Sequence, residues 1–302
     1  MNAKNPINLS YIISTRNRLP FLKIGLTYLL ENLQEDEEIV VVDGNSNDGT
    51  KEFLTKLYQT GKIHKYISEP DKNQAHGWNK AILLAEGKII KKIIDDDLFC
   101  FPAIQVCKEY MLKNESVDLC ISNCLNASLN NYKSIGYHSR IKQYLKWKDG
   151  HAKSFTFGDV SLLLRKSSTA YIGLYDTSFT MLDYEFSLRA SYLQANIAYY
   201  NGCNAMSIFN PVSVSGQVSK ATLQLDGKRA NFMYEYAGDS AEINIWSKIK
   251  IFFGKNRIIF FNNSQLQEQN DSSTTTESLP IIYNLYYQFL QKYHQSYQSN
   301  FL

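Results

Sequence analysis

The sequence predicts an α/β fold in which a mostly parallel sheet is flanked by helices. A strand, a loop and a helix follow one another three times along the first half of the chain, and a fourth strand closes the series. The β-branched run at residues 39–42 is continuous, which is typical of a parallel strand buried on both faces. Leu22, Leu26 and Leu29 recur at helical spacing between the first two strands. Such alternation forms open parallel sheets with helices on both faces.

The elements of the first half can be assigned in order. Pro20 opens the first helix, where its missing N–H costs little. The turn Asp48-Gly49-Thr50 starts the second helix, which should bury Phe53, Leu54, Leu57 and Tyr58. A third helix carries Trp78, Ala81, Ile82 and Ala85 on one side. The predicted strands span residues 9–14, 39–42, 63–68 and 89–94.

The second half is less regular. We predict helices over residues 101–113 and from Asp183 onward, the latter burying Phe186, Ala190 and Leu193. Strands are predicted at residues 118–122, 160–164 and 197–200. Residues 123–150 are polar and rich in Tyr, and we expect a long excursion over a cleft. Residues 262–277 resemble a polar linker, and residues 281–297 are predicted to form a helical C-terminal appendage.

Composition excludes several classes of protein. The 302 residues carry a net charge of +3, which is too balanced to indicate a nucleic-acid partner. The N-terminus lacks the pattern of a signal peptide, and no apolar run is long enough to span a bilayer. The five cysteines lack the spacing of a zinc site. A reduced, cytoplasmic protein is the expectation.

The acidic triplet (Asp95, Asp96 and Asp97) ends the fourth predicted strand. Carboxylates packed together repel one another and raise each other's pKa unless a cation joins them. Mn²⁺ and Mg²⁺ prefer such hard oxygen ligands, so one interpretation is a divalent-ion site. The other is a solvated acidic turn. The place of the triplet in the strand–helix series favours the ion site.

Charged residues also follow the other predicted strands, at the edge where such sheets bind ligands. Asp43 could cap its own turn or accept hydrogen bonds from a base or ribose. Arg16 and Arg18 could be solvated, or one could face a diphosphate. Asp71 follows the third strand. Asp183 could be a helix N-cap or belong to the same acidic edge.

Five motifs together resemble the family 2 glycosyltransferases, which share the GT-A fold. They occur in the family's order over roughly residues 8–215. The motifs are residues 12–18 (IISTRNR), 38–50 (EIVVVDGNSNDGT), 68–74 (SEPDKNQ) continuing to 79–81 (NKA), the acidic triplet, and 183–189 (DYEFSLR). This resemblance implies a GT-A domain over residues 1–235, with a nucleotide-sugar half at about 1–100 and an acceptor half at about 101–235. Residues 236–302 would be a C-terminal tail.

The resemblance also implies roles. Asp97 would hold Mn²⁺ or Mg²⁺ against a diphosphate, and Asp183 would be the general base. Asp43 would bind uracil or ribose. The residues implied in binding the nucleotide-sugar donor are Thr15, Arg16, Asp43, Asp71, Asp95 and Asp96. Which of Asp95 and Asp96 pairs with Asp97 stays open.

The implied reaction is inverting transfer of a sugar from a nucleotide donor, a UDP-sugar by expectation, to a hydroxyl of a glycan or lipid-linked acceptor, in cell-surface polysaccharide biosynthesis. Three features depart from the family: Lys91 and Lys92 precede the triplet, one residue is inserted between the triplet and Pro102, and Asp159 stands where many members carry His. A nucleotidyltransferase is a rival, although residues 14–18 contain no glycine for its phosphate loop. A non-catalytic nucleotide-sugar-binding protein is another.

The tail allows two interpretations. Residues 241–261 mix cations with Trp, Phe and Ile, which suits a helix lying on an anionic membrane surface. The same pattern suits a helix packed on the protein's own body. The sequence leaves open the sugar, the acceptor and the oligomeric state.

Overall fold

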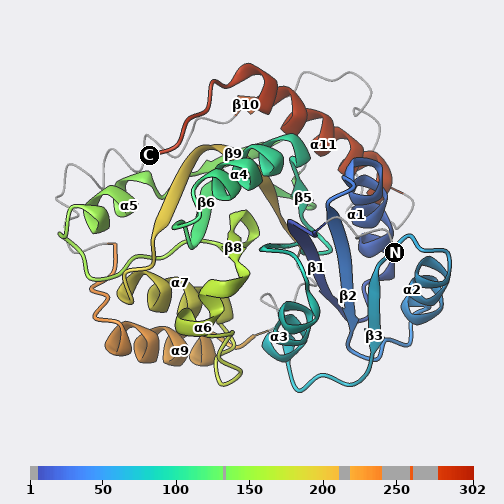
Figure 1. The fold of residues 1–302 in the computed structure, drawn as a ribbon, viewed down its shortest axis with the longest axis horizontal. Coiled ribbons are helices and arrows are strands. Elements are labelled where there is room, and N and C mark those ends of the chain that lie inside the picture. The colour runs from blue at the N-terminus through green and yellow to red at the C-terminus, as the bar shows by residue number, and fades with distance from the viewer. Residues whose placement is uncertain (1–5, 132–133, 211–217, 240–258, 261–277) are drawn as a thin grey trace.

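The computed structural model describes residues 6–131, 134–210, 218–239, 259–260 and 278–302. Within them a curled sheet forms the centre, and helices cover both of its faces (Figure 1). The first half of the sheet runs in the order β4-β1-β2-β3 and is entirely parallel. These strands are β1 (Leu9–Thr15), β2 (Glu37–Asp43), β3 (Lys65–Ser68) and β4 (Ile89–Lys92). The predicted α/β class is therefore confirmed.

The second half of the sheet is mixed. β8 (Leu163–Arg165) pairs antiparallel with both β4 and β6 (Leu119–Ser128). β6 pairs parallel with β9 (Ile197–Phe209) and antiparallel with β7 (Ser134–His138). Two short strands complete it: β5 (Leu98–Phe99) beside β9 and β10 (Ile259–Phe260) beside β7.

The sheet separates two apolar cores, because side chains alternate between its faces. Tyr11 and Ile13 of β1 point into one core, together with apolar side chains of α1 (Leu19–Asn32), α2 (Thr50–Gln59) and α4 (Phe101–Lys113). Ile12 points into the other, with side chains of α3 (Gln74–Leu84), α5 (Ile141–Lys148) and α7 (Leu182–Tyr192). Three short helices flank β8 along the chain. η1 (Asp159–Ser161) precedes it, and η2 (Lys166–Ser168) and α6 (Thr169–Ile172) follow it.

The C-terminal helix α11 (Leu279–Ser296) is present as predicted. It lies along the top of the molecule near α1 and β5, drawn in red in Figure 1. Tyr283, Tyr286 and Leu290 are buried in the same core as the α1 leucines. On the opposite side of the view α9 (Lys220–Met233) packs beside α7.

Several predictions about individual segments are wrong. Residues 123–150 are no excursion: most of them form the remainder of β6, then β7 and α5, because Cys124, Leu125 and Ala127 supply buried apolar positions between the polar ones. Residues 160–164 are divided between η1 and β8. Tyr58 and Leu193 are exposed, because each lies at the end of its helix, beyond the reach of the core.

Two predictions about the tail fall largely or wholly outside the described residues. The predicted linker, residues 262–277, is one. The proposed membrane segment, residues 241–261, is described only at Ile259–Phe260, which form a strand. None of the described helices is both long and apolar enough to cross a bilayer.

Candidate active site

A cavity of about 970 Å³ opens where β1 and β4 end and α7 begins. Its position agrees with the rule that open α/β sheets bind ligands beyond the carboxyl ends of their strands. All but one of the predicted site residues line it. These are Thr15, Arg16, Asp71, Asp95, Asp96, Asp97 and Asp183.

Arg18 forms ion pairs with two members of the acidic triplet, and its single positive charge offsets one of their two negative charges. Its Nε lies 3.4 Å from Asp95 Oδ1, and its Nη2 donates a short hydrogen bond to Asp96 Oδ2. Thr15 Oγ1 donates to the other oxygen of Asp95 at 2.9 Å. Burial raises the pKa of Asp95 to about 6, against the opposing effect of Arg18. The loop after β1 thus holds these two carboxylates in place.

Asp97 is different, since it forms no ion pair with any residue that the structure describes. Its Oδ1 accepts a 2.7 Å hydrogen bond from the backbone N–H of Ile208 on β9. Burial raises the pKa of Asp97 well above its usual range, and the neighbouring Asp96 adds to the effect. A carboxylate held in this way favours a cation beside it.

The donor set fits a divalent ion that is shared with a substrate. Among the described residues no three His, Cys, Asp or Glu side chains are grouped to hold a metal by themselves. Mg²⁺ typically needs only one or two carboxylates, with phosphate oxygens and water completing its shell. Asp97 in a cavity lined by oxygen ligands meets that requirement.

Asp43 and Asp71 lie at the ends of neighbouring strands but differ in availability. Asp43 is fully buried and absent from the cavity wall; its carboxylate accepts hydrogen bonds from Ser46 N–H and Oγ and from Ser68 Oγ at 2.7 Å. Asp71 lines the cavity, and Lys80 Nζ lies 2.7 Å from its Oδ1. The turn-capping interpretation therefore describes Asp43 in this structure.

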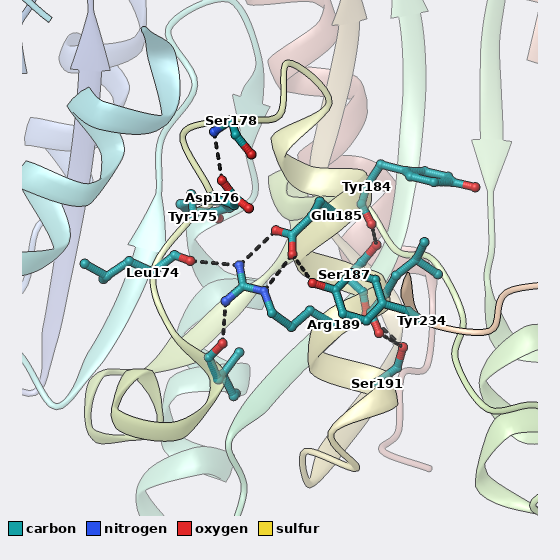
Figure 2. A network of polar contacts seen from close by, with 12 residues as sticks. Leu174, Tyr175, Asp176, Ser178, Tyr184, Glu185, Ser187, Arg189, Ser191 and Tyr234 are labelled. Carbon is teal, nitrogen blue, oxygen red and sulfur yellow. Dashed lines mark hydrogen bonds and ion pairs between the residues drawn. The ribbon is translucent and has the colours of Figure 1, made fainter. Parts of the chain in front are cut away.

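Two carboxylates begin α7, and only one of them is engaged by a cation. Figure 2 shows Glu185 held by Arg189, one turn later on the helix, at 2.7 and 2.9 Å, and by Tyr234 O–H at 2.6 Å. Arg189 also donates to the carbonyl oxygens of Ile172 and Leu174. Glu185 is therefore a structural anchor that ties α7 to the preceding loop.

Asp183 faces the cavity and has no ion-pair partner among the described residues. The residue is exposed to solvent at the cavity wall. Desolvation by the surrounding groups, followed by the charge of Asp159, raises the pKa of Asp183 to about 6, while Lys92 opposes the rise. A carboxylate with such a pKa is suited to accept a proton near neutral pH.

The sequence interpretation missed how several residues contribute. Arg18 was weighed beside Arg16 but not placed against the triplet, and only the fold reveals that contact. Lys92 and Asp159 were noted as departures, and the structure shows that they pair with each other inside the cavity wall. Lys92 and Asp159 carry opposite charges and both depart from the family pattern, and this combination could have predicted their ion pair.

Comparisons with known proteins agree with this geometry. The model of the glycosyl transferase family 2 matches residues 10–172, more than half of the chain. An uncharacterised glycosyltransferase of Rickettsia conorii is 28% identical over 113 residues, which cover 37% of this chain and 18% of that protein. One of Nostoc sp. is 28% identical over 95 residues, covering 31% and 29%. The matched part thus spans less than a third of either curated relative.

Solved structures show the same fold. Residues 1–349 of S. aureus TarS in complex with UDP-GlcNAc superpose with a TM-score of 0.55 at 13% identity, covering 80% of this chain and 77% of that one. The same fragment without that ligand gives a TM-score of 0.51 at 14% identity and the same coverage. Because the family model covers more than half of its residues, the chain belongs to glycosyl transferase family 2.

Proposed function

We propose that the protein is an inverting glycosyltransferase that moves a sugar from a UDP-sugar to a hydroxyl group of a glycan or lipid-linked acceptor, in the assembly of a cell-surface polysaccharide. One observation carries this proposal: Asp97 and Asp183, the two carboxylates without a cation partner among the described residues near the site, line the same cavity. Its volume, about 970 Å³, is of the size that binds cofactors and small molecules.

The donor would occupy the side of the cavity formed by the loops after β1 and β3. Arg16 is exposed there and lines the wall together with Thr15 and Asp71, so its guanidinium can pair with a diphosphate. Asp43 would reach the base or ribose only if Ser46 or Ser68 released its carboxylate. UDP as the nucleotide is supported by the similar fold of the TarS fragment, whose structures include complexes with UDP and UDP-GlcNAc.

A divalent ion, Mn²⁺ or Mg²⁺, would be held by Asp97 together with the diphosphate of the donor. When bound, it supplies positive charge that stabilises the leaving diphosphate. Asp95 and Asp96 would act differently, because both already form ion pairs with Arg18. They would orient the ribose and sugar through their remaining oxygen lone pairs.

Asp183 would act as the general base. The acceptor oxygen attacks the anomeric carbon, its proton passes to Asp183, and the bond from that carbon to the diphosphate breaks, releasing UDP. The transition state resembles an oxocarbenium ion, as in glycoside hydrolysis. A single displacement from the opposite face inverts the anomeric centre.

Donor binding and turnover can be measured separately. A thermal-shift screen of UDP-sugars with Mn²⁺ should raise the melting temperature for the true donor, because a ligand that binds only the folded state stabilises it. Asp97→Asn should abolish the Mn²⁺-dependent part of the shift. Asp36→Asn, a carboxylate paired with Lys108 outside the cavity, is the matched control.

Release of UDP in the presence of acceptor sugars would then establish transfer. A thermal shift without any UDP release would indicate the non-catalytic binder instead. Release of pyrophosphate from a nucleoside triphosphate and a sugar phosphate would indicate the nucleotidyltransferase.

A further inference from the structure

A buried ion pair, Lys92 with Asp159, lies in the wall of the cavity that holds Asp183. The Lys92 side chain is 6% exposed and that of Asp159 10%. Lys92 ends β4, and Asp159 opens η1. The pair thus joins the strand that precedes the acidic triplet to η1, and both residues line the cavity wall.

Aromatic rings enclose the ammonium group. Lys92 Nζ lies 4.3 Å from the ring centre of Trp78 and 4.4 Å from that of Tyr175. Both distances are within the range of cation–π attraction, which is strongest where water is excluded. Tyr175 O–H also lies 3.5 Å from Asp159 Oδ2. Four separate segments therefore fix the charges of this pair in one geometry.

Buried ion pairs contribute little net stability, since desolvation offsets their attraction. A pair that is retained beside a reacting group therefore invites a functional explanation. We propose that Lys92 and Asp159 are positioning residues that act through Asp183, holding its carboxylate ready to take the acceptor proton at neutral pH. The inference rests on the proposed role of Asp183 as the base.

The two charges act on Asp183 in opposite directions. Asp159 disfavours a second negative charge nearby and raises the pKa of Asp183, whereas Lys92 lowers it. The charge of Asp159 also raises the pKa of Asp97. Asp226 of α9 is occupied by the backbone N–H groups of Thr180 and Met181. The other charged or titratable groups around the start of α7 include Tyr175, Asp176, Tyr184, Glu185, Arg189, Arg229 and Tyr234.

The test is the acid limb of the pH profile of kcat/KM, the side on which activity falls as the pH is lowered, because it reports the pKa of the base in the free enzyme. Lys92→Met leaves Asp159 unopposed and should shift this limb to higher pH by about one unit. Asp159→Asn should shift it to lower pH by a similar amount. The double variant should restore the limb close to the wild-type position, and Lys92→Arg should leave it nearly unchanged. Coupling of this kind is what a double-mutant cycle measures.

A structural role would not produce opposite shifts. Lys108→Met breaks another buried ion pair, with Asp36 and Glu37, on the far side of the sheet; it should lower the melting temperature without moving the limb. If Lys92→Met does not fold, the downward shift of Asp159→Asn decides by itself. An unmoved limb, or shifts in the same direction, overturns the inference. Turnover retained by Asp183→Asn would show that Asp183 is not the base, whereas absence of UDP release from the wild-type protein would overturn the proposed function.

Discussion

The acidic triplet and the start of α7 share one arrangement of charges, in which an arginine pairs with some of the carboxylates but not with another. In each, an arginine holds part of the acidic group: Arg18 binds Asp95 and Asp96, and Arg189 binds Glu185. In each, one carboxylate is left without a cation among the described residues, Asp97 in the first and Asp183 in the second. The arginine-bound carboxylates build the site, and the remaining two are available for chemistry.

The two places differ in how the arginine is supplied. Arg189 lies one helical turn from Glu185, so their contact is local and needs only α7. Arg18 comes from the loop after β1, 77 residues before Asp95. Glu185 is buried outside the cavity wall, whereas Asp95 and Asp96 line it. The first arginine is therefore architectural, and the second is coupled to the donor site.

The largest effect is expected at the unpaired carboxylate of α7. Asp183→Asn should lower turnover by about 10²–10⁴-fold, the usual contribution of a positioned general base, and leave the UDP-sugar thermal shift intact. Steady-state kinetics and the thermal shift, measured on one preparation, test this. Asp176→Asn, a nearby exposed carboxylate, is the control. Near-wild-type turnover would show that Asp183 is not the base.

Removal of either arginine should expose the difference between the two places. Arg189→Met leaves Glu185 buried without its partner and should cost about 3–5 kcal/mol of unfolding free energy, measured by urea denaturation. Arg18→Met should also destabilise the fold, and in addition should weaken donor binding. If both variants bound donor like the wild type, Arg18 would be architectural too.

The pH dependence of activity sharpens the assignment of the base. Asp183, with a pKa of about 6, accepts a proton only when it is ionised, so it is active above that pH and inactive below. We expect kcat/KM to be flat above about pH 7 and to fall at least tenfold per pH unit well below pH 6, because Asp95 of the proposed donor site takes up a proton in the same range. A profile that stayed level down to pH 4.5 would exclude a base with this pKa.

The smallest effect is expected at Tyr283, whose O–H donates a 2.7 Å hydrogen bond to the backbone carbonyl of Asp96. Tyr283→Phe leaves that buried carbonyl without this donor and should cost about 1–3 kcal/mol of stability. The melting temperature measures the loss. Tyr293→Phe, on the same helix, provides a comparison. If the two variants lowered the melting temperature equally, the hydrogen bond to Asp96 would contribute no more to stability than the hydroxyl group of Tyr293 does.

The first half of the fold could be predicted because its strands and helices are marked locally. Residues 39–42 are β-branched throughout, and the α1 leucines keep one period, so each element is evident from its own residues. The helix at α4 was predicted with its observed bounds. β6 was predicted to end at residue 122, because its polar and apolar residues alternate across a mixed sheet and resemble a loop.

The site was predicted in part for the same reason. The triplet and Asp183 stand at strand and helix ends, where the chain itself marks them. The contacts of Arg18 with Asp96 and of Lys92 with Asp159 join residues 78 and 67 positions apart. Such pairings depend on how the sheet closes, which no local pattern encodes. Asp43 shows the reverse, since its position was predicted but its carboxylate is used by two serines.

The bond from Tyr283 to Asp96 has a consequence for how the protein is made. The tyrosine follows the triplet by 187 residues, so the ribosome delivers the acidic loop long before the helix that supports it. The parallel strands can assemble on the emerging chain, since domains generally fold as they are synthesised. The Asp96 carbonyl gains its tyrosine donor only when α11 has left the exit tunnel, and nascent chains released earlier would carry the sheet without this bond.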